Sequence, residues 1–156
     1  MVAPPLSLVD GDQGPVNGVA SLLLSLSVVG LLISTYFTAV AYRWVRPDVR
    51  WVPSFCRMDE HTCASIVFTP QARVFLFPNS VLGQLYYVGI FFGVVFGWIG
   101  GQAPPPGSYV AASALTVCLG LYLGYALLFI NRVACPLCFA SHGINLTIFL
   151  ILVVPT

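Results

Sequence analysis

CPLCFASHGINLTIFLILVV, residues 135–154, places two closely spaced cysteines at the mouth of an apolar run. The run from Pro136 to Val154 approaches the ~20 residues that an α-helix needs to cross the hydrocarbon core of a bilayer. A Cys-x-x-Cys pair at a helix start is a poised dithiol, because the helix dipole and the first backbone N–H groups stabilise a thiolate. The stretch therefore predicts a membrane helix that begins with reactive thiols.

Three further apolar stretches lie upstream, and the composition agrees with a membrane protein. Of the 156 residues, 58% are hydrophobic and only 7% are charged, with a net charge of +1 that gives no support to nucleic-acid binding. The expected spans are Val16–Tyr42, Ser80–Ile99, Tyr109–Ile130 and Pro136–Val154. Each should be helical, because backbone groups inside a bilayer must satisfy their own hydrogen bonds.

The expected fold is an all-α integral membrane protein, a four-transmembrane-helix bundle. Residues 1–15 form an N-terminal tail and residues 16–156 form one membrane domain. Within that domain, residues 43–79 form a loop or short-helix cap between the first two helices. The proline-rich segment 102–107 is a tight turn between the second and third.

Counting crossings places the two cysteine-bearing segments on one face of the membrane. The cap loop carries Cys56 and Cys63, and the segment before the fourth span ends at Cys135, with Cys138 one turn later. Two spans separate these segments, so the chain returns to the same side between them. All four cysteines are therefore expected on one face, with both termini on the other.

Two rules disagree about which compartment this face meets. Every arginine in the chain lies on the cysteine side, which the positive-inside rule assigns to the cytoplasm. Disulfide chemistry favours an oxidising compartment instead. We expect a multi-pass protein of a prokaryotic cell membrane or the endoplasmic reticulum, with periplasmic or lumenal cysteines, and the inverted orientation stays open.

The cap loop is too long to be a simple connection, and its content is apolar. Its large apolar side chains are Trp51, Phe55, Ile66, Val67, Phe68, Val74, Phe75, Leu76 and Phe77. A loop of this composition must bury itself, and we expect it to close the mouth of the bundle as a lid. Anchoring at the membrane interface for stability alone is the other interpretation.

Polar residues continue below the cysteine pair along the fourth span. Cys138, His142 and Asn145 follow one another at helical spacing, so they share one face of the expected helix. Polar groups at membrane depth usually serve function, and an imidazole near a thiol can exchange protons with it. For both His142 and Asn145, a hydrogen bond between helices is the competing explanation.

Cysteines also serve as packing residues, metal ligands and structural disulfides. Cys118, inside the third span, is expected to be a packing residue. Zinc is disfavoured, because six residues separate Cys56 from Cys63, more than zinc-ligand pairs usually have, and we expect no metal. A structural disulfide between those two is plausible but leaves the Cys-x-x-Cys pair unexplained.

Taken together, the chain resembles the vitamin K epoxide reductase family of membrane thiol oxidoreductases. The matching elements are Cys56 and Cys63, Thr69, the segment Asn79-Ser80-Val81-Leu82-Gly83, the Cys135-Pro-Leu-Cys138 motif and the Ile144-Asn145 that follows. The resemblance covers nearly the whole chain beyond residue 15. It implies a four-helix bundle that encloses a quinone and is capped by the first loop.

The resemblance also implies a role for each matching residue. Cys138 faces the quinone, Cys135 pairs with Cys138 or exchanges with the loop, Cys63 relays electrons to Cys135, and Cys56 meets a thioredoxin-like protein. Asn79 donates a hydrogen bond to a quinone carbonyl, and Thr69 supports the lid or the thiol. Leu82, His142 and Asn145 complete the expected quinone-binding set.

Two departures from the family pattern affect the substrate and the partner. His142 stands where the animal enzymes carry tyrosine, which puts epoxide reduction in doubt, so the substrate is vitamin K, menaquinone, ubiquinone or the epoxide. The chain ends at Thr156 without a thioredoxin-like domain, so the expected partner is a separate thioredoxin-fold protein. The competing function is a non-enzymatic tetraspan protein with a structural loop disulfide.

Overall fold

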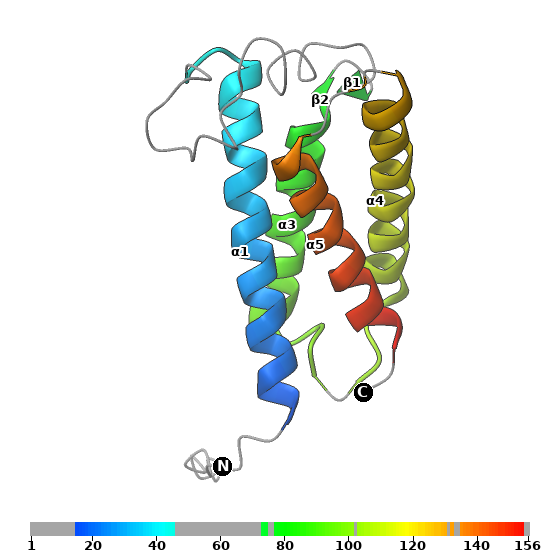
Figure 1. Cartoon of the computed structure of the whole chain (residues 1–156). Helices are drawn as coiled ribbons and strands as arrows, with labels where there is room; N and C mark the ends of the chain where they lie inside the picture. Colours follow the sequence, from blue (N-terminus) through cyan, green and yellow to red (C-terminus); the bar gives the residue numbers. More distant parts are fainter. Residues whose placement is uncertain are drawn as a thin grey trace, which may run out of the picture.

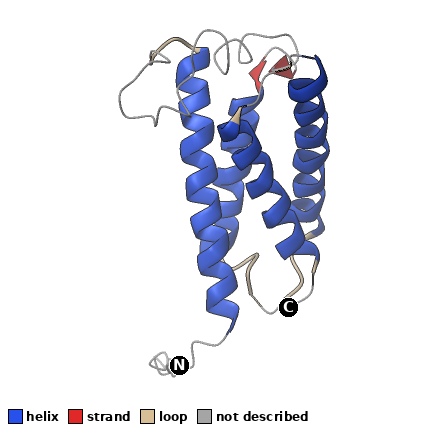
Figure 2. Cartoon of the chain, in the orientation of Figure 1, coloured by secondary structure: helices blue, strands red, loops and turns tan. Residues whose placement is uncertain are grey.

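The computed structural model describes residues 15–45, 73–74, 77–101, 103–130, 132 and 135–154. Its elements are α1 (Pro15–Ala41), β1 (Arg73–Val74), β2 (Phe77–Pro78), α3 (Asn79–Val95), α4 (Gly107–Tyr125), the π-helical segment η2 (Ala126–Ile130) and α5 (Pro136–Val153). The described chain is thus mostly helical, with short loops and one small antiparallel hairpin (Figure 2). The all-α expectation is confirmed for the described helices, and the two-residue strands of the hairpin, which pairs Val74 with Phe77, lie directly before α3.

The helices run side by side as a bundle (Figure 1). Helix α1 packs along α3, α4 packs along α5, and α5 also touches α1. The ends of α1 and η2 and the beginnings of α3 and α5 lie at one end of the bundle, beside the hairpin. The core between the helices is centred on Leu23, Tyr87, Ile90 and Ile148, each at most 1% exposed.

Two of the helices end in the same hydrogen-bond pattern. At the end of α3, Trp98 N donates to Gly93 O and Gly97 N donates to Val94 O, both around a left-handed Gly97 with φ 71°. This pair of bonds is a Schellman motif, which favours glycine because a left-handed backbone crowds a Cβ. Gly97 therefore ends α3 at Val95, whereas the apolar run had predicted a helix as far as Ile99.

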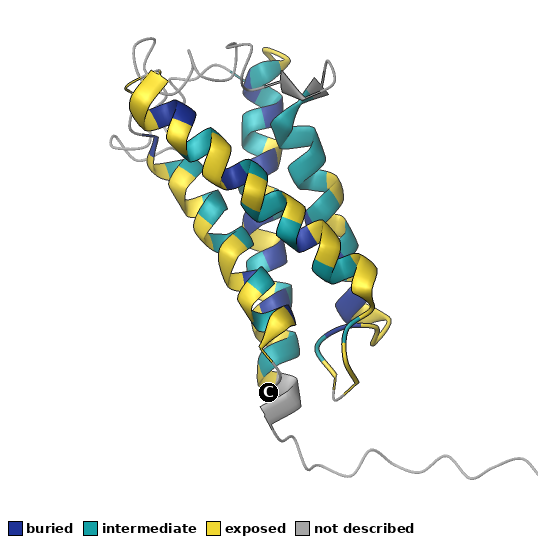
Figure 3. Ribbon diagram, turned by 90° about the vertical axis from the view of Figure 1, so that its right-hand side faces the viewer, coloured by how far each residue is buried: buried dark blue, intermediate teal, exposed yellow. Residues whose placement is uncertain are grey.

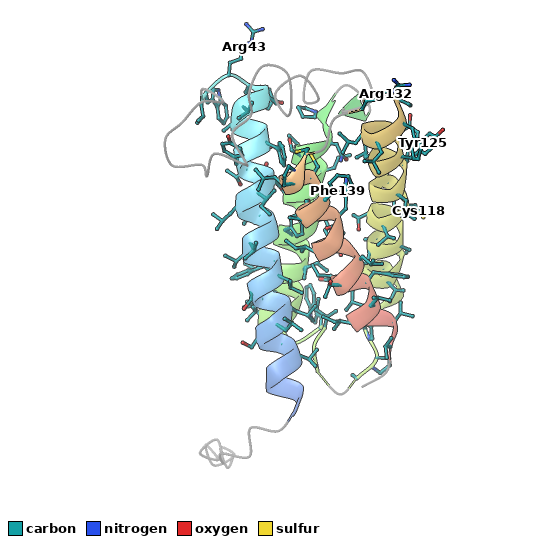
Figure 4. All side chains as sticks on the ribbon, viewed as in Figure 1. Arg43, Cys118, Tyr125, Arg132 and Phe139 are labelled. Atoms are coloured by element: carbon teal, nitrogen blue, oxygen red, sulfur yellow. The ribbon has the colours of Figure 1, made fainter. Side chains whose placement is uncertain are left out.

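The end of α1 repeats this pattern with an arginine in the glycine position. Trp44 N donates to Ala39 O at 2.8 Å, and Arg43 N donates to Val40 O at 2.9 Å. Arg43 has a φ of 60°, and Arg132, after η2, has a φ of 52°. Both arginines lie at the same end of the bundle (Figure 4). Left-handed backbone in a residue with a Cβ costs about 1 kcal/mol, so other contacts at this end must offset it.

Three of the helical segments are long and apolar enough to cross a bilayer. They are Gly18–Ala41, Gly107–Ile130 and Pro136–Val153. Helix α3 has 17 residues, and at 1.5 Å per residue it is roughly 26 Å long, somewhat less than the ~30 Å of a bilayer core. The protein is therefore a multi-pass membrane protein, in which the shorter helix α3 packs beside the three longer helices.

The outward faces of the helices are exposed (Figure 3), and they carry many large apolar side chains. Large exposed side chains include Leu32, Leu85, Leu115, Leu121 and Leu150. Such faces suit contact with lipid chains rather than water. Cys118 belongs to this outer surface of α4 (Figure 4), so its expected role as an internal packing residue is wrong.

Candidate functional site

The Cys135-Pro-Leu-Cys138 motif forms the first turn of α5, as the sequence predicted. Cys135 is the N-cap residue with extended backbone, and Pro136 takes the first helical position, where its missing N–H is not needed. The Sγ atom of Cys135 accepts a hydrogen bond from Cys138 N at 3.4 Å. At the N-cap, this sulfur lies at the positive end of the helix dipole.

Burial divides the two cysteines of the motif. Cys135 is fully buried, whereas Cys138 is partly exposed. Cys135 packs against Val40 in the last turn of α1, and Tyr36 and Phe37 surround this contact. Cys138 is therefore the more accessible cysteine of the pair.

Helix α1 also holds the beginning of α3. Thr38 Oγ1 forms a hydrogen bond with Ser80 Oγ at 2.9 Å, and one turn deeper Gln84 Nε2 donates to Thr35 Oγ1 at 3.1 Å. Thr38 lies two residues before Val40, the contact of Cys135. The last turns of α1 are thus a common platform for the first turns of α3 and α5.

Two expected quinone-binding residues lie on this first part of α3. Asn79 is the first residue of the helix and follows Pro78, the last residue of the hairpin. Asn79 and Leu82 are both half-buried. Because α3 and α5 begin at the same end of the bundle, Asn79 and the cysteine motif are brought to one end (Figure 1).

Asn145 has a protein partner in the structure. Tyr87 on α3 donates to Asn145 Oδ1 at 2.7 Å, and its hydroxyl also lies 3.2 Å from Ser141 Oγ. The Tyr87 ring is 1% exposed and sits over Gly30 of α1, where an added Cβ would overlap the ring. One side chain on α3 thereby joins α1 and α5. The hydrogen bond between helices, the competing explanation for Asn145, is what the structure contains.

His142 points toward a different helix from Asn145. A Cβ built on Gly120 of α4 would lie 2.9 Å from His142 Nδ1 and 3.3 Å from Cγ, so the imidazole edge rests on the α4 backbone. His142 Nδ1 is buried and has no hydrogen-bond partner within the described part of the chain. The expected shared face is therefore divided, since Asn145 contacts α3 and His142 contacts α4.

The remaining expected site residues, Cys56, Cys63 and Thr69, lie outside the described residues. Among the residues that are described, no group of three or more His, Cys, Asp or Glu side chains is placed to hold a metal ion. The cysteine pair thus lies at the N-terminus of a helix inside an apolar bundle. Deeper along α5, Asn145 is hydrogen-bonded, whereas His142 Nδ1 has no hydrogen-bond partner among the described residues.

Comparison with known families gives this arrangement a context. The family model described as "Vitamin K epoxide reductase family" matches residues 21–153, most of the chain. The chain belongs to the vitamin K epoxide reductase family. Members of this family are membrane redox enzymes generally associated with quinones and thioredoxin-like partners, so this protein is a membrane oxidoreductase in that broad sense. Among individual curated proteins, none matches the chain significantly.

Sequence reasoning missed three residues that shape the site in this family member. Tyr87, Gly30 and Gly120 each look ordinary in an apolar helix, since aromatic residues and glycines are common in membrane spans. Small residues at helix contacts are the one available signal, because they allow backbones or rings to approach closely. That signal does not say which side chain fills the space.

Proposed function

We propose that this protein is a quinone-linked thiol–disulfide oxidoreductase. Electrons pass from a separate thioredoxin-fold protein to Cys56 and Cys63, then to Cys135 and Cys138, and finally to a quinone in the membrane. The reaction supports disulfide formation in the partner. The observation that carries the proposal is the cysteine motif at the start of α5, with a buried N-cap cysteine and a more accessible second cysteine.

Each step of the proposed relay moves two electrons and two protons. The Cys135–Cys138 dithiol is oxidised to a disulfide as the quinone becomes quinol. The Cys63 thiolate then attacks Cys135 and releases Cys138, and Cys56 resolves the mixed disulfide to leave a Cys56–Cys63 disulfide. The partner dithiol reduces that disulfide and becomes oxidised. Exchange of this kind needs a thiolate, which the N-cap position of Cys135 favours once the pair is reduced.

The quinone is proposed to lie near the start of α5, within reach of Cys138. A hydrogen bond from Asn79 to a carbonyl oxygen stabilises the charge that develops as the ring is reduced. His142, one turn below Cys138, exchanges protons with the reacting groups. Leu82 supplies apolar contact, and Asn145 acts through its hydrogen bond with Tyr87. Thr69 supports the lid or the thiol.

We further propose that α3 crosses the membrane with the three longer helices. Its apolar surface and its packing against α1 support this, although its 17 residues are at the short end for a span. Four crossings put both cysteine pairs on one face. We assign that face to the periplasm or lumen, where disulfides persist, and alkylation of intact cells with a membrane-impermeant maleimide tests this assignment.

The relay is tested by two single variants of the full chain. Cys138→Ala is expected to abolish quinone reduction with every reductant, because the sulfur that meets the quinone is gone. Cys56→Ala is expected to block reduction by a thioredoxin-fold protein. It is expected to retain activity with dithiothreitol, which can reduce the Cys135–Cys138 disulfide directly. Full quinone reduction by Cys138→Ala would refute the scheme.

A further inference from the structure

The contact between His142 and Gly120 has a consequence for catalysis. We propose that Gly120 is a positioning residue, which seats the His142 imidazole against α4 so that its Nε2 edge alone serves the reaction. The proposal rests on the proposed function, in which His142 exchanges protons during quinone reduction. It adds a residue on a helix that carries none of the expected site residues.

The close approach at Gly120 leaves no room for a side chain. A Cβ there would lie 2.9 Å from Nδ1, closer than real Cβ contacts, and 3.6 Å from Cε1. The ring belongs to α5, which packs along α4, so a methyl group at Gly120 would force the imidazole to rotate or the helices to separate. Glycine is the only residue that permits this seat.

The position of the His142 ring against α4 also determines which imidazole nitrogen can exchange protons. Nδ1 is buried against α4 and has no hydrogen-bond partner in the described part of the protein. A group covered in this way cannot meet a quinone or a thiol, so proton exchange must use Nε2, on the opposite edge of the ring. A neutral imidazole carries one proton, and with that proton on Nδ1 the Nε2 atom is free to accept another.

The protons then balance in the reduction of the quinone by Cys135 and Cys138. Quinone reduction takes up two electrons and two protons, and the Cys135 and Cys138 thiols release the same number as their disulfide forms. His142 Nε2 accepts the proton of Cys138 and passes it to a quinone oxygen, and the second proton comes from Cys135. The imidazole ends in its starting state, so no further reactant is needed.

Gly124 provides a matched control on the same helix. It lies one turn after Gly120, and a Cβ built there meets nothing within 4 Å. Both substitutions to alanine add the same methyl group and the same helix propensity. Only Gly120→Ala disturbs the imidazole.

The experiment compares Gly120→Ala, Gly124→Ala, His142→Ala and the double variant Gly120→Ala/His142→Ala in lipid nanodiscs. The substrates are a short-chain ubiquinone and dithiothreitol. Gly120→Ala is expected to lower kcat at least ~10-fold while KM changes less than ~3-fold, because general acid–base catalysis is worth roughly 10²–10⁴-fold. Gly124→Ala is expected to stay within about twofold of the wild type.

The double variant separates positioning from general damage. If Gly120 acts through the imidazole, adding Gly120→Ala to His142→Ala changes kcat less than ~2-fold, since interacting positions are not additive. The same reasoning applies to thermal unfolding. If Gly120→Ala lowers Tm through the imidazole, it should not lower Tm further when His142 is already alanine. Should Gly120→Ala fail to fold alone, folding of the double variant supports the seat and its failure to fold overturns it.

The outcomes distinguish this inference from the proposed function. No quinone reduction by the wild-type protein would refute the function itself. An active wild type with equal rates for Gly120→Ala and Gly124→Ala would overturn only the inference. A further fall in kcat of ~10-fold in the His142→Ala background would also overturn it.

Discussion

The hydroxyl of Tyr87 is expected to contribute measurably to the stability of the bundle. Tyr87→Phe keeps the ring over Gly30 but removes the donor to Asn145 Oδ1, a bond of 2.7 Å. The same change removes the contact with Ser141 Oγ at 3.2 Å. Single hydrogen bonds between membrane helices are worth about 0.6 kcal/mol and at most ~1.7 kcal/mol. An acceptor left unsatisfied adds roughly 1 kcal/mol.

Tyr87→Phe should therefore lower the free energy of unfolding by about 1–2 kcal/mol. For a chain of this size, each kcal/mol lowers Tm by roughly 2–4 °C. Thermal unfolding in one detergent, followed by circular dichroism, measures the shift.

Tyr86→Phe is the matched control for this measurement. The Tyr86 hydroxyl lies 2.9 Å from Ser113 Oγ, and Ser113 keeps its bond to Tyr109 O at 2.8 Å when that hydroxyl is removed. Its partner Ser113 therefore keeps a hydrogen bond, so the loss should be less than half as large. An unchanged Tm for Tyr87→Phe, or equal losses for the two variants, would refute the reasoning.

Two glycine pairs give further predictions from the same unfolding assay. Gly97→Ala is expected to destabilise by about 1 kcal/mol, because its φ of 71° disfavours a Cβ, whereas Gly89→Ala, in helix α3 with nothing within 4 Å, should stabilise by up to ~1 kcal/mol. If both variants changed the free energy of unfolding in the same direction, the left-handed Gly97 at the end of α3 would be contradicted. Gly30→Ala should destabilise by about 1–3 kcal/mol, because the new methyl overlaps the Tyr87 ring, and Gly18→Ala on the same helix should not. Equal stability of these two variants would show that the ring does not occupy that position.

The helices could be predicted well from sequence because their signals are local. The apolar run after Cys135 and the proline at the next position suffice to begin a helix, and α5 begins there. Hydropathy alone predicts a longer α3, since the apolar run continues through Phe96 and Trp98. A left-handed Gly97 ends the helix by conformation rather than by polarity. The π-helical turn Ala126–Ile130 left no trace in the sequence pattern.

The candidate site was predicted in part, for a related reason. Helical spacing predicts that His142 and Asn145 share one face of α5, whereas in the structure Asn145 contacts α3 and His142 contacts α4. Spacing within one helix cannot show that two neighbouring helices share that face, so the separate contacts with Gly120 and Tyr87 emerged only from packing. The cap-loop thiols Cys56 and Cys63 lie outside the described residues, so their predicted roles remain predictions.

A single-turnover measurement tests the central claim most directly. The variant Cys56→Ala/Cys63→Ala/Cys118→Ala retains only Cys135 and Cys138, so every thiol counted belongs to the inner pair. It is reduced with dithiothreitol, freed of reductant, and mixed anaerobically with a short-chain ubiquinone. The account predicts one quinol per protein molecule, formed together with loss of both alkylatable thiols. No quinol, or quinol formed while both thiols persist, would contradict the claim that Cys135 and Cys138 reduce the quinone.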